Sequence, residues 1–241
     1  KYRLAGSLDE VAIYDRALTA NEIAQHHTEG LAGIDYCGGS AAPTLGYAPY
    51  PDDTISLWPL DEAAGSTTYV DIFGVNDGSG NDAPTAVAGT VIGAQMFDGA
   101  GTGIDVPASR TFNWLTTESF SIEYWVKMDA NTSGRNMVTL GRTDGTAVGA
   151  YWFTGVTPAG TPTFQLQDSS GSVTVTGTTA VTDNAWHLVV AVRDATTGKN
   201  FIYVDDGAPV EAPAAYTGNG FLFNEAPLYI GWFDLTGIGE Y

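Results

Sequence analysis

Short strand-like segments are the feature that most limits what this chain can fold into. They recur along most of the 241 residues and are separated by Gly, Asn and Asp. In residues 120–127, Phe120, Ile122 and Tyr124 alternate with polar residues such as Ser121. This period of two is typical of strands that bury one face, and too few helical patterns are present for a parallel α/β fold. We therefore predict an all-β protein in which two antiparallel sheets pack as a β-sandwich. The clearest predicted strands are residues 55–60, 120–127, 137–140, 163–167, 172–176, 187–193, 201–204 and 228–232.

The charge balance limits the possible partners. The chain has 9 Lys+Arg against 28 Asp+Glu, a formal net charge of −19. Such a chain cannot form the basic face that nucleic acids or anionic membrane surfaces require. No apolar run approaches the roughly 20 residues of a membrane span, so we predict no membrane insertion. A low-lysine, acidic, Gly- and Thr-rich composition favours an extracellular or cell-surface location.

Helical signal is confined to the N-terminal region. Thr19 and Glu22 have the spacing of a capping box, which predicts a helix of about two turns that ends before Gly30. Residues 29–54 are rich in Gly, Ala, Pro and Tyr without periodicity, which is typical of a linker. The single cysteine, Cys37, lies in this linker, so the chain has no internal disulfide framework and no multi-cysteine zinc site.

Several segments match a known family in the order that the family has them. They are residues 57–62 (LWPLDE), 97–107 (FDGAGTGIDVP), 120–126 (FSIEYWV), 183–190 (DNAWHLVV), 201–207 (FIYVDDG) and 228–231 (LYIG). Together they resemble the laminin G-like or concanavalin A-like jelly-roll modules of bacterial surface proteins. The resemblance implies a jelly-roll sandwich of two antiparallel sheets with one short helix.

The resemblance is cyclically out of phase with the chain. Residues 6–18 (GSLDEVAIYDRAL) resemble the last strand of the family, which normally stands at the end of the domain. We therefore divide the chain into residues 1–28, a final strand plus short helix, residues 29–54, a linker, and residues 55–241, a laminin G-like sandwich that lacks its last strand.

Three origins of the missing strand remain open. The N-terminal strand could complete its own domain as a permuted strand, enter a neighbouring subunit as a donor strand, or end a preceding repeat. The linker could span roughly 85 Å at about 3.3 Å per residue, so its reach does not exclude the first. We favour an assembly, because the unpaired N-terminal strand of one chain is complementary to the sandwich that lacks its last strand in another. A head-to-tail contact of this kind that does not close into a ring forms a filament. The residues that would complete the acceptor sandwich are Leu8, Val11, Ile13 and Tyr14.

A Gly-rich acidic loop is the best candidate for a metal site. Residues 71–82 combine carboxylate and amide oxygens, which are the ligands that calcium prefers. The resemblance also implies a structural calcium near this loop. The predicted ligands are Asp71, Asn76, Asp77, Asp98 and, from the N-terminal strand, Asp9. The alternative is that these acids form turns on a solvated surface.

Aromatic residues near loops are candidates for sugar binding, because a flat ring can cover one face of a pyranose. The candidates are Trp152, Trp232, Trp114 and Tyr151. The alternative is that these rings pack between the sheets.

Catalysis has little support in the sequence. Sandwich glycosidases need two carboxylates placed across a cleft, and no Glu-x-Asp-x-x-Glu run is present. Asp9 and Glu10 are adjacent and would point to opposite faces of a strand. We interpret His187 as a half-buried structural residue, and we expect His26 and His27 to lie at the frayed end of the predicted helix. We predict no enzymatic activity and no catalytic residues.

These patterns together predict a non-enzymatic extracellular structural or adhesive module. It would be a subunit or repeat of a surface assembly or filament joined by strand complementation, with copies of itself or neighbouring repeats as partners. The alternative is a calcium-dependent carbohydrate-binding module of a larger secreted protein, with a glycan as partner. This rests partly on fold-level analogy, because the architecture hosts lectins, enzymes and spacers.

Overall fold

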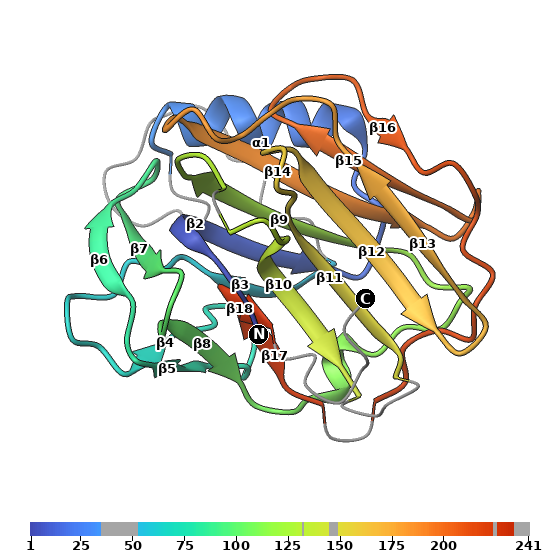
Figure 1. Ribbon diagram of the computed structural model, residues 1–241, viewed down its shortest axis with the longest axis horizontal. Helices are drawn as coiled ribbons and strands as arrows, with labels where there is room; N and C mark the ends of the chain where they lie inside the picture. Colours follow the sequence, from blue (N-terminus) through green and yellow to red (C-terminus); the bar gives the residue numbers. More distant parts are fainter. Residues whose placement is uncertain (35–52, 132, 145–148, 224–225, 234–241) are drawn as a thin grey trace.

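The computed structural model describes residues 1–34, 53–131, 133–144, 149–223 and 226–233 (Figure 1). Its helices are α1 (Ala20–Leu31) and the 3-10 helix η1 (Arg110–Phe112). Its strands are β1 (Tyr2–Arg3), β2 (Ala5–Tyr14), β3 (Thr54–Trp58), β4 (Thr68–Tyr69), β5 (Gly78–Asn81), β6 (Thr85–Ala88), β7 (Gly93–Asp98), β8 (Gly103–Val106), β9 (Phe120–Lys127), β10 (Met137–Thr143), β11 (Tyr151–Val156), β12 (Pro162–Asp168), β13 (Gly171–Thr176), β14 (Trp186–Asp194), β15 (Lys199–Val204), β16 (Val210–Glu211), β17 (Leu228–Ile230) and β18 (Trp232–Phe233).

Two large antiparallel sheets pack face to face, which confirms the predicted all-β jelly-roll sandwich. The first, called the β2 sheet, has the order β16-β15-β14-β9-β2-β7-β6, and β3 also pairs with β2. The second, called the β10 sheet, has the order β13-β12-β11-β10-β17-β8-β5-β4. Some neighbouring strands are consecutive hairpins, such as β10 to β13, whereas others, such as β2 and β9 or β10 and β17, come from distant parts of the chain, so the fold also depends on long-range pairing.

The N-terminal strand lies inside the β2 sheet of its own chain. β2 pairs along one side with β9, where Leu8 faces Val126. Along the other side it pairs first with β7 and then with β3, where Val11 faces Trp58. The structure therefore has the strand in the permuted arrangement. Its exchange with a neighbouring subunit and its origin in a preceding repeat stay predictions.

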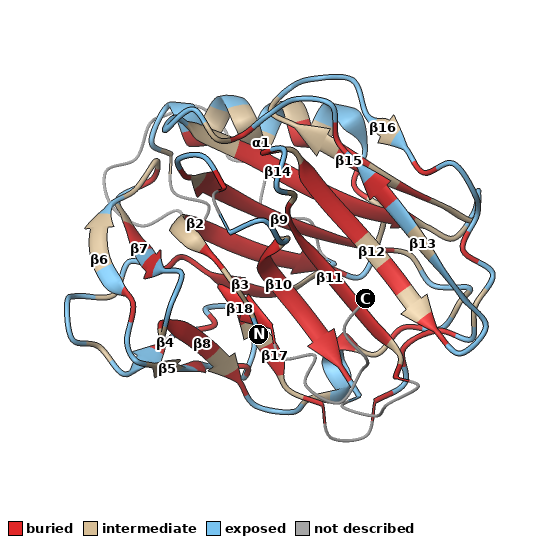
Figure 2. Cartoon of the chain, viewed as in Figure 1, coloured by how far each residue is buried: buried red, intermediate tan, exposed pale blue. Residues whose placement is uncertain are grey.

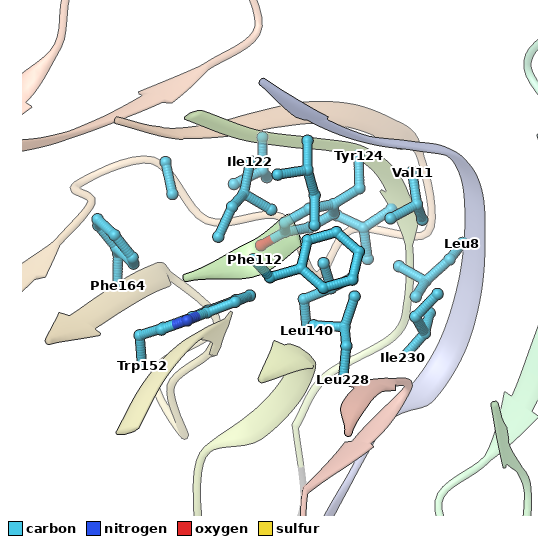
Figure 3. Packing of buried hydrophobic residues seen from close by; sticks show 14 of the residues in the cluster. Leu8, Val11, Phe112, Ile122, Tyr124, Leu140, Trp152, Phe164, Leu228 and Ile230 are labelled. Carbon is cyan, nitrogen blue, oxygen red and sulfur yellow. The ribbon is translucent and has the colours of Figure 1, made fainter. Parts of the chain in front are cut away.

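The core forms between the two sheets because each strand turns its apolar side inward (Figures 2 and 3). From β2, the side chains of Leu8, Val11 and Ile13 join this core and are fully buried. Tyr14 is also fully buried, but it lies on the outer face of the β2 sheet in a second cluster. The four predicted residues of the strand are thus divided between two apolar layers.

Helix α1 covers this outer face. Its N-terminus has the predicted capping box, in which the Thr19 hydroxyl accepts from the Glu22 N–H and the Glu22 carboxylate accepts from the Thr19 N–H. The predicted end before Gly30 is wrong, because the helix continues to Leu31. A Cβ at Gly30 would lie 2.5 Å from the Trp125 ring, so the glycine allows a close approach to the sheet rather than ending the helix.

The boundaries predicted for the N-terminal segment and the linker shift accordingly. Helix α1 runs across the boundary between residues 28 and 29, and β3 begins at Thr54. Cys37 and most of the predicted linker lie outside the described residues.

The first and last described strands lie side by side. In the pair formed by β1 and β18, Tyr2 faces Phe233 and Arg3 faces Trp232. Tyr2 and Phe233 join Tyr151 and Phe153 in a third cluster on the outer face of the β10 sheet. Neither described helix has the length and apolar character needed to span a membrane.

Candidate cation site

A bulge in β2 begins the site. Between Asp9 and Ala12 the register advances three residues along β2, whereas β9 advances only two, from Trp125 to Glu123. The extra residue, Glu10, has a φ of 49° in the left-handed region. The bulge lies where β2 changes its partner from β7 to β3, and it interrupts the regular alternation on which the prediction of opposite faces for Asp9 and Glu10 depends.

The Asp9 carboxylate is fully buried and only half satisfied. Its Oδ2 atom accepts hydrogen bonds from the N–H groups of Thr90 (2.7 Å) and Val91 (3.0 Å). Its Oδ1 atom is buried and has no hydrogen-bond partner. Burial, with a smaller contribution from the charge of Asp61, outweighs the backbone hydrogen bonds and raises the pKa of Asp9 to about 7. A buried anionic oxygen without a donor is costly unless something positive lies against it.

Two other segments bring further oxygen atoms to the bulge. Asp61 follows β3, and its Oδ1 atom accepts from the Gly93 N–H at 2.6 Å. Thr90 lies in the turn between β6 and β7, and its hydroxyl oxygen is buried without a partner. A Cβ at Gly89 would lie 2.5 Å from Asp9 Oδ2, so this turn requires a glycine beside the carboxylate.

Backbone strain is concentrated in the same three segments. Among the described residues, six non-glycine residues have positive φ, and three of them are Glu10, Leu60 (63°) and Ile92 (55°). Such conformations cost roughly 1–3 kcal/mol each and persist where the surrounding structure requires them, often at functional sites. The strain therefore supports a specific role for this junction.

The chemistry of these oxygens fits a hard cation. No group of three or more His, Cys, Asp or Glu side chains within the described ranges could hold a metal ion. The carboxylates of Asp9 and Asp61 lie near the bulge, and the charge of Asp61 acts on Asp9. Calcium accepts a mixed shell of oxygen ligands, whereas zinc prefers nitrogen and sulfur.

The predicted loop ligands form a hydrogen-bond network instead. Asp71, Asn76 and Asp77 do lie together, as predicted. However, Asp71 is surrounded by donors: the Ser56 hydroxyl, the N–H groups of residues 57, 73, 74 and 76, and the Asn76 amide, all at 2.8–3.3 Å. Asp77 Oδ1 accepts from the Asp71 N–H at 2.8 Å. Donors rather than a cation satisfy Asp71, which corrects its assignment as a ligand.

We expect Asp71→Ala to destabilise the fold without affecting any calcium response. The substitution leaves several buried donors without an acceptor, which costs about 3 kcal/mol. Asp77→Ala is the matched control, because Asp77 is exposed and accepts a single described hydrogen bond from the loop. Thermal unfolding with and without calcium measures both effects. A calcium response that disappears with Asp71→Ala would return this loop to the ligand set.

Asp98 organises a separate turn. Its Oδ1 atom accepts from the N–H groups of Ala100, Gly101 and Thr102 and from the Thr102 hydroxyl, at 2.8–3.1 Å. The backbone hydrogen bonds hold the pKa of this carboxyl well below its usual range. Of the five predicted ligands, the structure thus brings three together in one loop, and places Asp98 and Asp9 elsewhere.

The predicted sugar-binding rings on β11 and near η1 are core residues. Trp152 is 0% exposed, and Trp114 stacks on Phe120 with ring centroids 3.8 Å apart. Both belong to the main core (Figure 3 shows Trp152 within it). Neither can present a flat face to a sugar, so their assignment as ligand-binding residues is wrong.

The other two rings lie on the outer face of the β10 sheet but are covered. Trp232 is 6% exposed, its indole N–H donates to Asp105 Oδ1 at 2.7 Å, and the cationic groups of Lys1 and Arg3 lie 5.1 and 5.4 Å from its ring. Tyr151 is 7% exposed and donates its hydroxyl to Gln167 at 2.8 Å. Existing contacts therefore occupy the surfaces that a glycan would need.

Sequence reasoning missed Asp61 and Thr90. Asp61 stands in the segment LWPLDE, which resembles the opening strand of the family, and that resemblance was the one signal that could have identified it. Thr90 carries no sequence signal. Only the meeting of three distant segments at the bulge places it next to Asp9.

Comparison with known families agrees with this architecture. Residues 98–236 match a laminin G-like family described as the concanavalin A-like lectin/glucanases superfamily. The chain belongs to this superfamily, which confirms the resemblance seen in the sequence. The match begins at the end of β7, so it does not include β2, and the out-of-phase order of the strands stays a prediction. No curated protein matched the chain.

Proposed function

We propose that this chain is a non-enzymatic structural or adhesive module of an extracellular or cell-surface protein, stabilised by a calcium ion at the β2 bulge. The position of β2 carries the proposal. The same strand supplies core residues between the sheets and places the half-satisfied Asp9 carboxylate at the junction of three segments. A cation there would fasten the permuted strand to the body of the sandwich.

The environment of Glu123, one of two buried glutamates in the β2 sheet, supports a structural role over catalysis. Glu123 on β9 is fully buried and binds His26 of the overlying helix α1 at 2.9 Å. A glycosidase needs a pair of carboxylates that substrate and water can reach. Glu123 is instead covered and paired within the fold.

A carbohydrate-binding function has less support, because the four aromatic candidates are buried or covered by existing contacts. The family match is compatible with glycan binding, but a site for it would have to use polar groups outside these rings. We therefore retain the structural or adhesive role as the first proposal.

Chelation tests the calcium proposal. We expect saturating calcium to raise the melting temperature by about 5–10 °C over the chelated protein, since calcium at 100 times its Kd stabilises by about 2.7 kcal/mol. Asp9→Asn should abolish most of this shift, because it removes the charge that would bind the ion. Asp98→Asn is the matched control and should keep the shift.

Two outcomes would contradict the calcium proposal. One is an identical melting temperature with calcium and with chelator. The other is a calcium shift that survives in Asp9→Asn, which would place the ion elsewhere.

Native mass tests the assembly part of the proposal. The first and last described strands, β1 and β18, pair with each other within one chain. In a head-to-tail assembly, β1 of one copy could pair instead with β18 of another. Light scattering over a dilution series, with and without calcium, measures whether chains remain single. A mass that stays at 25.3 kDa under both conditions would exclude strand-exchanged assembly of this chain. Chain-like masses that resist dilution would support it.

A further inference from the structure

The chain has three histidines, and the structure brings all of them to one interface. His26 and His27 lie on α1, which covers the outer face of the β2 sheet (Figure 1), and His187 lies at the start of β14, where it shares the carboxylate of Asp205 with His27. Each imidazole faces at least one carboxylate. All three imidazoles of this acidic chain therefore lie near carboxylates around the contact between α1 and the β2 sheet.

His26 connects the helix to β9. Its Nδ1 atom lies 2.9 and 3.1 Å from the two carboxylate oxygens of Glu123, whose side chain is fully buried. The Tyr14 ring lies 6.2 Å away, and Glu22 and Glu29 of α1 add negative charge. Burial lowers the pKa of His26, but the charge and hydrogen bond of Glu123 outweigh this, so the net direction is upward.

His187 makes contacts that suit a protonated ring. Its Nδ1 atom lies 2.9 Å from Asp205 Oδ2, and its Nε2 atom lies 3.1 Å from Asp183 Oδ1. A neutral imidazole has one donor and one acceptor, whereas ionised carboxylates only accept. Both contacts are therefore satisfied together only when the ring carries two protons. The hydrogen bond with Asp205 is the main cause that raises the pKa of His187.

Asp205 links the two elements. Its Oδ1 atom lies 3.5 Å from His27 Nε2 on α1, and its Oδ2 atom binds His187 on β14. His27 also stacks on Trp125 of β9, with ring centroids 5.5 Å apart. Asp205 itself is held by the Leu188 N–H at 3.0 Å. One carboxylate thus receives an imidazole from the helix and another from the sheet.

We propose that His26, His27 and His187, with their carboxylate partners, form a pH-dependent clamp, called the histidine clamp, that holds α1 on the β2 sheet and loosens as His26 and His187 lose their protons. Charged and titratable groups face the clamp from each element packed around it. They are Glu123 on β9, Tyr14 on β2, Asp205 after β15, Asp183 before β14, Glu22 and Glu29 on α1, and Arg16 in the turn before α1.

The direction of the effect follows from linkage. His26 and His187 bind protons more tightly in the folded protein than an unfolded histidine, which titrates near pH 6.5. Their contribution to docking is fully present below about pH 6.5 and is lost as the pH rises through their higher folded values. Loosening would uncover apolar residues of the second cluster, including Trp125, Leu188 and Val190.

NMR titration of the full chain gives the first test. Because the chain has three histidines, every imidazole signal belongs to the clamp. We expect the midpoints of His26 and His187 to lie above about 6.5. Midpoints at or below that value would overturn the proposal, whatever the behaviour of the variants.

Hydrogen exchange of the α1 amides gives the second test, expressed as protection factors so that the intrinsic pH dependence cancels. We expect α1 protection to fall between about pH 6 and pH 8.5, because His26 and His187 lose their protons as the pH rises through folded pKa values that lie above the ordinary value. The amides of β11 and β12 should change little. The same measurement in Asp9→Asn excludes the other buried group that titrates near neutrality.

Variants separate the clamp from general helix stability. The double variant His26→Gln, His187→Gln keeps polar side chains that do not titrate, so its α1 protection should be nearly independent of pH. Arg16→Gln is the matched control, because it breaks the 2.7 Å ion pair with Glu22 without removing an imidazole. It should lower α1 protection equally at both pH values. A double variant that keeps the wild-type pH profile would overturn the proposal.

Discussion

Deleting residues 1–18 should abolish cooperative unfolding and lead to aggregation. The deletion removes Leu8, Val11 and Ile13 from the centre of the β2 sheet and leaves the ladder groups of β9 and β7 without their partner. Each lost core side chain costs about 2–5 kcal/mol when truncated to alanine, and domains have only about 5–15 kcal/mol in total. Thermal unfolding and light scattering measure the outcome.

A graded variant and a rescue make this prediction specific to β2. Leu8→Ala should cost about 2–5 kcal/mol, whereas Ser7→Ala, one position away and only half-buried, should cost less than about 0.5 kcal/mol. A peptide of residues 1–18 added in trans should restore a cooperative transition to the deleted chain. If the deleted chain melts like the full chain, the sandwich does not need this strand.

Trp152→Ala should be the most damaging single substitution among the residues first expected to bind sugar. The ring is fully buried and lies against Trp114 and Phe120, with centroids 5.5 and 6.2 Å away. Truncating a buried Trp costs about 3–5 kcal/mol, which lowers the melting temperature by about 6–20 °C in a chain of this size.

A conservative variant separates packing from recognition. The indole N–H of Trp152 is buried without a hydrogen-bond partner, so Trp152→Phe removes no such bond and should cost clearly less than Trp152→Ala. Glycan-array binding is measured on the same proteins. A Trp152→Ala variant that melts normally but loses binding to a glycan would contradict the core position and restore the ring as a binding surface.

Much of the fold could be predicted because strand patterns are local. The alternation in residues 120–127 and the capping box at Thr19 each require only neighbouring residues, and the structure has both features. β11 was not predicted as a strand. It is buried on both faces, so its sequence YWFTGV lacks the alternation that marks a half-buried strand.

The sequence by itself determined the class of fold, the out-of-phase final strand and the apolar residues by which that strand joins a core, because these follow from side-chain periodicity and motif order. Only the tertiary structure decided where individual polar groups act. Asp71 proved to accept hydrogen bonds in a turn, whereas Asp9 meets Asp61 and Thr90 from distant segments, and His26 meets Glu123 across a helix–sheet interface. The role of a carboxylate or imidazole depends on which donors and charges lie within a few ångströms, and long-range strand pairing sets those neighbours.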